Sequence, residues 1–430
     1  MRNLSHRVTS AVFSSGQPAV KSSNLINRGR TKKRALFLVR AYNDLDHIAP
    51  VIWKMASAGS DVAYVLTAGE FPGDYRINLL RKVGARRVRS ATIEAYDRRL
   101  RKKIRPNALR SLVDWIFTLS FGCIFLKRHA IGCVAVEWGG AIGRGRASFF
   151  LRAARLMNLP TLSIPHGYHT WLDNDFNEVS RDTGRLPQFP DRNRYTRNVV
   201  QSENIKRYCM ESAIRKDKMA VLGSARFCKE WSDLNRSLCI DANKKTIYRN
   251  TQNLVVLFFL NHWNYNVNRE RCLNLLNAIA KEKEVTLVIK GHTRGKESGG
   301  LSLSEEKSLD RFGNVLYPDD QVHSPYLVDQ SDVVIVYGSS ICFEALRQGK
   351  TVIWPRFVCS NRTIFNQGEI VTHAEDEYEV IQIIRAAVNG VRPVPTQKNL
   401  ESFFRIHVEG GKNQSSVLRQ YAETITSYLR

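Results

Sequence analysis

The sequence predicts an α/β protein made of two doubly wound parallel sheets in tandem, and three observations support this prediction. Short apolar segments rich in Val, Ile and Leu alternate with helical segments through most of the chain, which is typical of parallel sheets covered by helices. At 430 residues the chain is too long for one hydrophobic core of ordinary size. Polar residues follow the predicted strands, and ligands bind at that edge of an open parallel sheet.

The elements of the first predicted sheet follow a basic segment rich in Ser and Asn. They are strands at 35–39, 61–67, 134–138 and 161–165, and helices near 48–58, 75–83 and 147–157. The second set comprises strands at 198–202, 219–223, 254–260, 285–291, 314–317, 332–337 and 351–354, and helices near 205–211 and 269–280. We therefore expect a basic flexible tail at 1–33, an N-terminal domain at 34–197, a C-terminal domain at 198–395 and a helical segment at 396–430.

The chain carries a large positive charge. It has 65 Lys and Arg against 40 Asp and Glu, a formal net charge of +25, which favours a polyanionic partner, an anionic membrane surface or anionic substrates. The sequence contains no zinc-finger spacing, RNP-like aromatic strand or compact basic helix-turn-helix pattern, so we expect no nucleic-acid partner. Its eight cysteines form no C-x-x-C pair, which predicts reduced core residues and a cytoplasmic protein.

The most apolar segment is 111–126, which lies between Arg110 and Lys127. It contains Asp114 and is shorter than the roughly 20 residues that cross a bilayer. A buried core helix is the preferred interpretation. The alternative is a helix that lies on an anionic membrane surface, because basic residues flank the segment at both ends.

The segment 331–355 predicts an anion site. An apolar, β-branched strand at 333–336 runs directly into Gly338, Ser339 and Ser340 and then into a helix. Gly permits a close turn and Ser can cap the helix, so that backbone N–H groups and the positive helix end face a ligand such as phosphate. An ordinary capped helix of an α/β domain is the alternative.

Further polar residues follow other predicted strands and complete an expected anion-binding floor in the second half. The full set is Gly223, Ser224, Arg226, His292, Arg294, Gly338, Ser339 and Ser340. Helix ends and cationic side chains can stabilise the charge of a leaving pyrophosphate without a metal ion, so no metal ligand is assigned. The triplet Asp173–Asp175 has a spacing that can hold a divalent cation, but such triplets are common in loops.

Three residues at predicted strand ends of the first half are candidates for a general base: Asp46, Glu137 and His166. A base must lie within hydrogen-bond reach of the acceptor hydroxyl, and strand ends make that geometry possible. Each candidate has a structural alternative. His166 is then a loop histidine, Glu137 an ion-pair partner of Arg144 or Arg146, and Asp46 a helix N-cap.

Three short motifs resemble GT-B-fold transferases that build bacterial surface polysaccharides. They are Gly338-Ser339-Ser340 with Glu344-Ala345-Leu346 and a strand ending in Pro355, the sequence Ile164–Gly167, and the sequence Val288–His292. Similar elements occur in capsule-polysaccharide transferases and in the CDP-glycerol glycerophosphotransferase group. The resemblance implies two Rossmann-like domains with a cleft between them. It also implies that Ser339, Ser340 and His292 contact the donor phosphates, that Glu344 reaches the ribose or the sugar, and that His166 faces the cleft.

The function expected from these features is transfer of a sugar, or a polyol phosphate, from a nucleotide-activated donor to a surface-polysaccharide acceptor. The donor is CMP-, CDP- or UDP-linked, no further cofactor is expected, and the acceptor is a glycan or a lipid-linked glycan. The basic charge places such an enzyme in the cytoplasm, on the inner face of the membrane. A hydrolysing nucleotide-sugar 2-epimerase and a non-enzymatic basic protein that binds nucleic acid or membrane are the alternatives.

Overall fold

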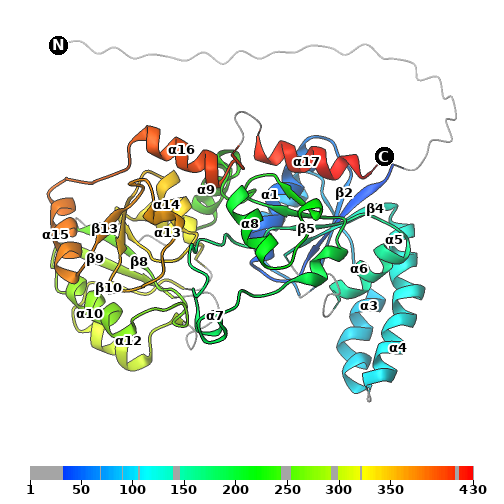
Figure 1. The fold of residues 1–430 in the computed structure, drawn as a ribbon, viewed down its shortest axis with the longest axis horizontal. Coiled ribbons are helices and arrows are strands. Elements are labelled where there is room, and N and C mark those ends of the chain that lie inside the picture. The colour runs from blue at the N-terminus through cyan, green and yellow to red at the C-terminus, as the bar shows by residue number, and fades with distance from the viewer. Residues whose placement is uncertain are drawn as a thin grey trace, which may run out of the picture. The chain divides into compact units, whose positions relative to one another are not determined.

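The computed structural model describes residues 32–67, 69–89, 91–104, 107–138, 146–243, 253–291, 299–319, 322–411 and 416–429. Residues Lys33–Arg430 form one compact unit, and its helices and strands are labelled in Figure 1. The predicted basic tail lies outside the described residues, except for its last two positions. Within the compact unit the predicted fold class is confirmed, because two parallel sheets are covered by helices.

The N-terminal sheet has seven strands in the order β3-β2-β1-β4-β5-β6-β7, and every pairing is parallel. The strands are β1 Arg34–Val39, β2 Val62–Leu66, β3 Arg86–Arg87, β4 Ile131–Glu137, β5 Thr161–Ile164, β6 Arg197–Val200 and β7 Met219–Val221. Strands β2 and β4 are buried along their whole length. Such continuous apolar strands are expected when helices cover both faces of a sheet.

The C-terminal sheet has six strands in the order β10-β9-β8-β11-β12-β13, again with parallel pairings only. They are β8 Leu254–Phe259, β9 Val285–Lys290, β10 Val315–Leu316, β11 Val333–Ile335, β12 Thr351–Pro355 and β13 Thr372–Ala374. The sequence analysis did not predict β13, which is a short edge strand with only one buried residue. It contributes little hydrophobic signal for that reason.

The helices of the N-terminal half are α1 Asp44–Ser57, α2 Tyr75–Lys82, α3 Ala91–Ala95, α4 Asn107–Phe117, α5 Cys123–Arg128, α6 Ala147–Leu156, α7 Glu178–Thr183 and α8 Glu203–Glu211. Those that follow are α9 Lys229–Asn243, α10 Arg269–Ala280, α12 Leu303–Asp310, α13 Ser324–Gln330, α14 Cys342–Arg347, α15 Glu377–Val388, α16 Gln397–His407 and α17 Val417–Ser427. Several begin with a side-chain cap that the sequence contains, such as Ser202 on α8 and Asp376 on α15, and these caps satisfy N–H groups that a helix leaves unpaired.

The predicted domain boundary at 197/198 is wrong. Strands β6 and β7 pair with β5 in the N-terminal sheet, so the chain leaves that sheet after Val221. Residues 173–197, which precede the predicted boundary, instead connect the neighbouring strands β5 and β6 of one sheet. Polar composition alone does not distinguish a linker between domains from a long surface connection within one.

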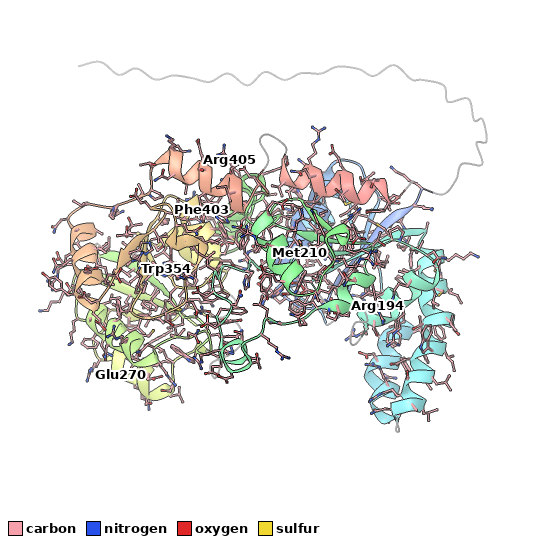
Figure 2. The ribbon with its side chains drawn as sticks, in the orientation of Figure 1. Arg194, Met210, Glu270, Trp354, Phe403 and Arg405 are labelled. Atoms are coloured by element: carbon pink, nitrogen blue, oxygen red, sulfur yellow. The ribbon has the colours of Figure 1, made fainter. Side chains whose placement is uncertain are left out.

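Two connections besides the β7–α9 link tie the halves together. Residues 170–172, which follow β5, pair with a loop of the C-terminal half: Leu172 N donates to Arg362 O at 2.9 Å, and Ile364 N donates to Thr170 O at 2.9 Å. The C-terminal segment, which contains α16 and α17, forms the second connection. The ring of Phe403 in α16 lies 5.5 Å from that of Phe365, which lies 5.7 Å from the ring of Trp354, and Figure 2 labels Phe403 and Trp354 in the same half.

Candidate active site

Both sheets reverse their strand order at one point, and these two points define the edge where ligands bind in open α/β sheets. In the N-terminal sheet the reversal lies between β1 and β4, and in the C-terminal sheet it lies between β8 and β11. Arg40 and Glu137 lie at the strand ends beside the first reversal. Asn261 and Gly338 lie in the loops beside the second. Asn261 Nδ2 donates to Tyr337 O at 3.1 Å and so fixes the loops after β8 and β11 together.

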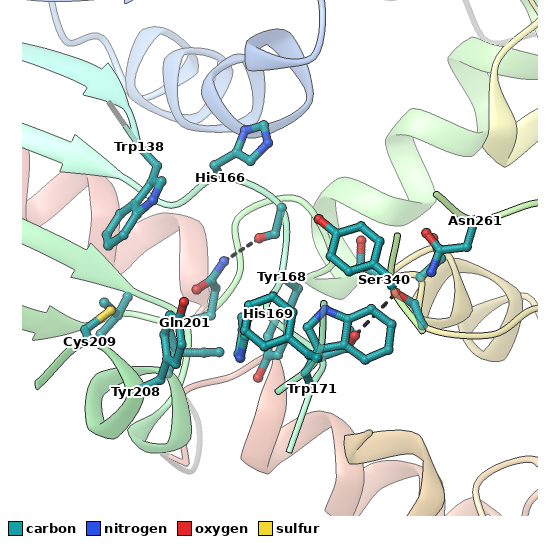
Figure 3. Close-up of a pocket in the computed structure, with 18 of the residues that line it drawn as sticks. Trp138, His166, Tyr168, His169, Trp171, Gln201, Tyr208, Cys209, Asn261 and Ser340 are labelled. Carbon is teal, nitrogen blue, oxygen red and sulfur yellow. Dashed lines mark hydrogen bonds between the residues drawn. The ribbon is translucent and has the colours of Figure 1, made fainter. Parts of the chain in front are cut away.

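A cavity of about 480 Å³ lies between these loops and the loops after β5 and β6. Figure 3 shows His166 and Gln201 from the N-terminal half and Asn261 and Ser340 from the C-terminal half around it. Its remaining lining residues include Gly167, Gly338 and Ser339. The structure therefore brings together three predicted donor-site residues, Gly338, Ser339 and Ser340, with the predicted base His166.

Aromatic rings dominate the wall of the cavity. The rings of His169 and Tyr208 are stacked at 3.9 Å, and those of Trp171 and Tyr265 are stacked at 5.4 Å. The guanidinium of Arg192 lies over the ring of Trp138, 3.8 Å from the ring centre. Burial lowers the pKa of His169 to about 4, so its ring is neutral at physiological pH. Flat aromatic walls of this kind stack on nucleobases or on the apolar faces of sugars.

Position 338 requires a glycine. Its backbone has φ of 66°, and a Cβ there would overlap the indole of Trp171 and lie 2.7 Å from Asn261 Nδ2. The glycine therefore permits the close turn that the sequence predicted. Helix α14 begins at Cys342 with Ile341 as its N-cap, and Ile341 makes no side-chain cap. Ser339 Oγ accepts from Ile341 N at 3.4 Å, so the predicted serine bond lies just ahead of the helix rather than at its N-cap.

Glu137 and His166 form a pair at the rim of the cavity. The Glu137 carboxylate contacts His166 Nδ1 through Oε1 and Arg40 through Oε2. The Glu137 side chain is only 2% exposed whereas that of His166 is 41% exposed. A carboxylate beside Nδ1 favours a proton on that nitrogen, which leaves Nε2 able to accept a proton. The contact is compatible with the prediction that His166 is the base.

His47, which belongs to α1, completes this corner of the site. Its Nε2 accepts from Gly167 N at 2.9 Å, and its ring lies 5.7 Å from that of His166. Burial, reinforced by Arg226, lowers the pKa of His47 well below its usual value. A neutral ring is needed for Nε2 to accept this bond. His47 therefore fixes the loop that carries His166.

The carboxylates near His166 raise the question of a metal ion. One ligand atom each from Asp44, Glu137 and His166 lies within 4.8 Å of the others. However, Arg40 N donates to Asp44 Oδ2 at 2.7 Å, and the Arg40 guanidinium bonds both Asp44 and Glu137. Arg40 already bonds both carboxylates and balances one of their two negative charges, so these three residues fit an ion-paired structural cluster better than a divalent-metal site.

Asp46 does not have the environment of a base. It forms ion pairs with Arg76 and, at 3.1 Å, with Arg226. Burial alone would raise the pKa of Asp46, but Arg226 and Arg76 outweigh burial and lower this pKa to about 2. A carboxylate with so low a pKa accepts protons poorly at neutral pH. We therefore replace the prediction that Asp46 is a base with a structural role.

Arg226 and Glu344 belong to the same network. Arg226 connects Asp46 in α1 to Glu344 in α14, with 3.2 Å between Arg226 Nη2 and Glu344 Oε1. Burial raises the pKa of Glu344, although Arg226 opposes the shift. Arg226 and the Oε1 atom of Glu344 are thus engaged in an ion-pair bridge between the halves, whereas Glu344 Oε2 is buried without a hydrogen-bond partner. Their contacts with the donor stay a prediction.

The Asp46 network makes acid stability a testable property. Because the pKa of Asp46 is lower in the folded protein than in the unfolded chain, its contribution of about 2 kcal/mol is present above pH ~4 and is lost as pH falls towards ~2. We expect Asp46→Asn to flatten the decline of unfolding free energy over this range, measured by urea titration. Asp233→Asn, which removes an exposed pair with Lys229, is the control and should leave the slope unchanged. Parallel curves for wild type and Asp46→Asn would contradict this account.

The remaining predicted site residues have other positions. Gly223 lies against the C-terminal segment: Tyr421 Oη donates to its carbonyl at 2.9 Å, and a Cβ on it would lie 2.6 Å from Val408 O. Ser224 N donates to Val408 O at 2.7 Å. Both residues dock α16 and α17, so their predicted anion-binding role is wrong. His292 and Arg294 lie outside the described residues.

The triplet Asp173–Asp175 holds the connection between the halves. Asp173 accepts from the backbone N of Arg362 at 2.7 Å and from its Nε at 2.8 Å, and Asp175 O accepts from Asn266 Nδ2 at 2.8 Å. The carboxylate of Asp173 therefore has a structural partner, whereas the bond at Asp175 uses only the backbone oxygen.

Sequence reasoning missed several residues of the site. Arg40 and His47 were not candidates in the sequence analysis, and their pairing with Glu137 and Gly167 joins residues about 100 positions apart. Trp138 is the last residue of a predicted strand, His169 follows another predicted strand, and Tyr208 lies within a predicted helix. The clustering of Trp, Tyr and His around predicted strand ends was the available signal.

The fold and the cleft define a two-domain protein of the GT-B type. No known family model and no curated protein matches the chain. Among solved structures, the UDP-GlcNAc 2-epimerase from Neisseria meningitidis bound to UDP-GlcNAc has a TM-score of 0.56 at 15% identity, covering 92% of this chain and 99% of that chain.

Two further solved structures have the same architecture. HepE from Anabaena in complex with UDP-glucose has a TM-score of 0.53 at 13% identity, covering 92% of this chain and 99% of that one. A glycosyltransferase from Rickettsia africae has a TM-score of 0.51 at 13% identity, covering 93% and 100%. These similarities show the GT-B fold that the motifs implied.

Proposed function

We propose that this protein is a transferase that moves a sugar from a nucleoside-diphosphate sugar to a hydroxyl of a glycan or lipid-linked glycan. The observation that supports this most strongly is the buried Glu137, which orients the exposed His166 at the rim of an aromatic cavity. The cavity is lined from both halves of a GT-B fold, and two of the solved structures that share this fold are bound to UDP-sugars. A UDP-linked donor is therefore our first choice among the CMP-, CDP- and UDP-linked classes.

In the proposed reaction an acceptor hydroxyl attacks the anomeric carbon of the donor, and the bond from that carbon to the diphosphate oxygen breaks. The hydroxyl proton passes to His166 Nε2, while Glu137 accepts from Nδ1–H and stabilises the imidazolium that forms. The nucleoside diphosphate leaves with the bonding electrons. Ser339 and Ser340, together with His292 and Arg294, are the proposed contacts of its phosphates.

We propose further that the reaction needs no metal ion. Asp44 and Glu137 both bond Arg40, and Asp173 is bonded to Arg362. Cationic side chains and backbone N–H groups can stabilise a leaving diphosphate without a divalent cation. In a variant that transfers a polyol phosphate, the acceptor hydroxyl would attack the β-phosphorus of the donor instead. The P–O–P bond would then break, and a nucleoside monophosphate would leave with the bonding electrons.

A thermal-shift panel tests the donor class. CMP, CDP, UDP, GDP and ADP are added to wild type and to Ser340→Ala, with magnesium or with EDTA. We expect UDP to raise the melting temperature of wild type, with a smaller rise in Ser340→Ala and no dependence on magnesium. A magnesium requirement would contradict metal independence, and no shift with any nucleotide would contradict the proposed donor site.

The same fold also serves 2-epimerases, so the products must be identified. With an N-acetylated UDP-sugar and no acceptor, the proposed transferase should leave the donor intact or release its sugar slowly with unchanged configuration at C2. Formation of the C2 epimer, detected by proton NMR, would replace the proposed activity with epimerisation while leaving the donor site in place.

A further inference from the structure

A helical hairpin made of residues 91–104 and 107–128 projects beyond the N-terminal sheet (Figure 1). One arm contains α3, a π turn at Tyr96–Leu100 and a 3-10 turn at Arg101–Lys103. The other arm is a continuous helix of 22 residues, Asn107–Arg128, with a π turn in its middle. The site described above uses no residue of this hairpin.

The inner face of the longer arm is packed and its polar groups are satisfied. Asp114, Thr118 and Gly122, spaced by four residues, are buried. Asp114 accepts from Tyr96 Oη at 2.9 Å and pairs with Arg101 Nε at 3.0 Å. A Cβ on Gly122 would lie 3.0 Å from Cβ of Ala153 in α6. This face fixes the arm to the protein.

The outer face of the same arm is apolar and exposed to solvent. Its exposed residues are Leu109, Leu112, Trp115, Ile116, Leu119, Phe121 and Ile124, with 40% to 61% of each side chain accessible. The preferred expectation of a buried core helix is therefore wrong for this face. A contiguous apolar patch of this kind marks an interaction site in a soluble protein.

Positive charge is dense in the sequence before this apolar face, since residues 98 to 110 include seven Lys or Arg and no Asp or Glu. Among the described side chains of this stretch, Arg99 and Lys103 are exposed, and Arg101 pairs with Asp114 on the inner face. Lys127 and Arg128 are exposed at the other end. Asp114 is the only acidic residue from 98 to 128, and it lies on the inner face.

From this combination we propose that the outer face of the hairpin docks on an anionic lipid bilayer. Its apolar side chains enter the boundary between headgroups and acyl chains, and the bordering cations meet anionic headgroups. The arm lies on the bilayer rather than crossing it, because its inner face carries the Asp114–Arg101 pair and packs against α6. Two copies facing each other would bring cationic borders together, so charge favours lipid over a second copy. The proposal does not depend on the proposed enzymatic activity.

Vesicle flotation tests this proposal, with phosphatidylcholine vesicles that contain either no phosphatidylglycerol or about 30% of it. Wild type should float with the anionic vesicles and remain in solution with the neutral ones. The double variant Leu112→Glu/Ile116→Glu should bind at least ~10-fold more weakly, because each glutamate must enter the headgroup boundary. Leu303→Glu, at a residue 70% exposed on α12, is the matched control and should bind like wild type. Lys127→Glu/Arg128→Glu, which leaves the apolar face intact, should lose the preference for anionic vesicles.

Trp115 provides a reporter at the contact itself, because it is the only one of the seven tryptophans that is highly exposed. Brominated lipids should quench its fluorescence, and Trp115→Phe should remove that quenching while binding persists. Absence of flotation, or equal flotation of wild type and Leu112→Glu/Ile116→Glu, would overturn the proposal. So would a dimer in ultracentrifugation that this double variant dissociates, since the face would then be covered by a second copy.

Discussion

His166→Ala is expected to lower kcat for nucleoside-diphosphate release by about 10²- to 10⁴-fold with little change in KM, because it removes the general base and leaves the donor contacts in place. Glu137→Gln should also lower kcat, since an amide in place of the carboxylate no longer holds Nδ1–H or stabilises the imidazolium. Steady-state kinetics measure both effects.

The matched control for this prediction is His373→Ala, in edge strand β13 of the other sheet. It should retain the kcat of wild type. Retention of more than half of kcat in His166→Ala would show that another group accepts the proton. A rise in KM with unchanged kcat would show that His166 only binds substrate.

Gly338→Ala is expected to destabilise the fold by about 2–4 kcal/mol and to weaken nucleotide binding at least ~10-fold, because the added Cβ strains a left-handed backbone and overlaps Trp171. Trp171 would have to move, and it forms a wall of the cavity. Urea unfolding and calorimetric titration with UDP measure the two effects.

Gly349→Ala separates the strain from the overlap. Gly349 has nearly the same φ, 67°, but a Cβ there meets no atom within 4 Å. It should therefore cost only about 1 kcal/mol and leave nucleotide binding unchanged. Equal effects of the two substitutions would contradict the argument that Gly338 is required by its contact with Trp171.

The parallel sheets were predictable because their signal is local. Segments such as Val62–Leu66 and Leu254–Phe259 are apolar along their whole length, and that pattern alone predicts a buried parallel strand. The assignment of β6 and β7 to the first sheet was not predictable in this way. That assignment depends on which strands pair, and the sequence of β6 does not indicate which sheet the strand joins.

The candidate site was predictable where chemistry and chain geometry coincide. The Gly338–Ser340 turn and His166 follow strands directly, and parallel strands bring their carboxyl ends to one edge. Asp46 was misread because its role depends on Arg76 and Arg226, which are distant in sequence and lower its pKa. The ion pair of Arg226 with Glu344 was not predicted for the same reason. A charged residue near a strand end binds a ligand or stabilises the fold, depending on its partners. Only the three-dimensional structure identifies those partners.

The segment 111–126 is a further case in which the sequence alone did not predict which residues are buried. Composition made a buried core helix reasonable, and Asp114 argued against a membrane span. In the fold Asp114 is turned inward and paired with Arg101, which leaves the apolar residues of the opposite face exposed. Which face is covered depends on the crossing with α6 at Gly122, a contact without a local sequence signal.

Hydrogen–deuterium exchange with and without saturating UDP tests most directly whether the aromatic cavity is the nucleotide-sugar site. We expect UDP to slow exchange in the loops at 166–171 and 338–341, with no change in the longer arm of the hairpin at 107–128. Protection confined to other parts of the chain, or none at a concentration that saturates binding, would contradict the site on which the proposed function depends.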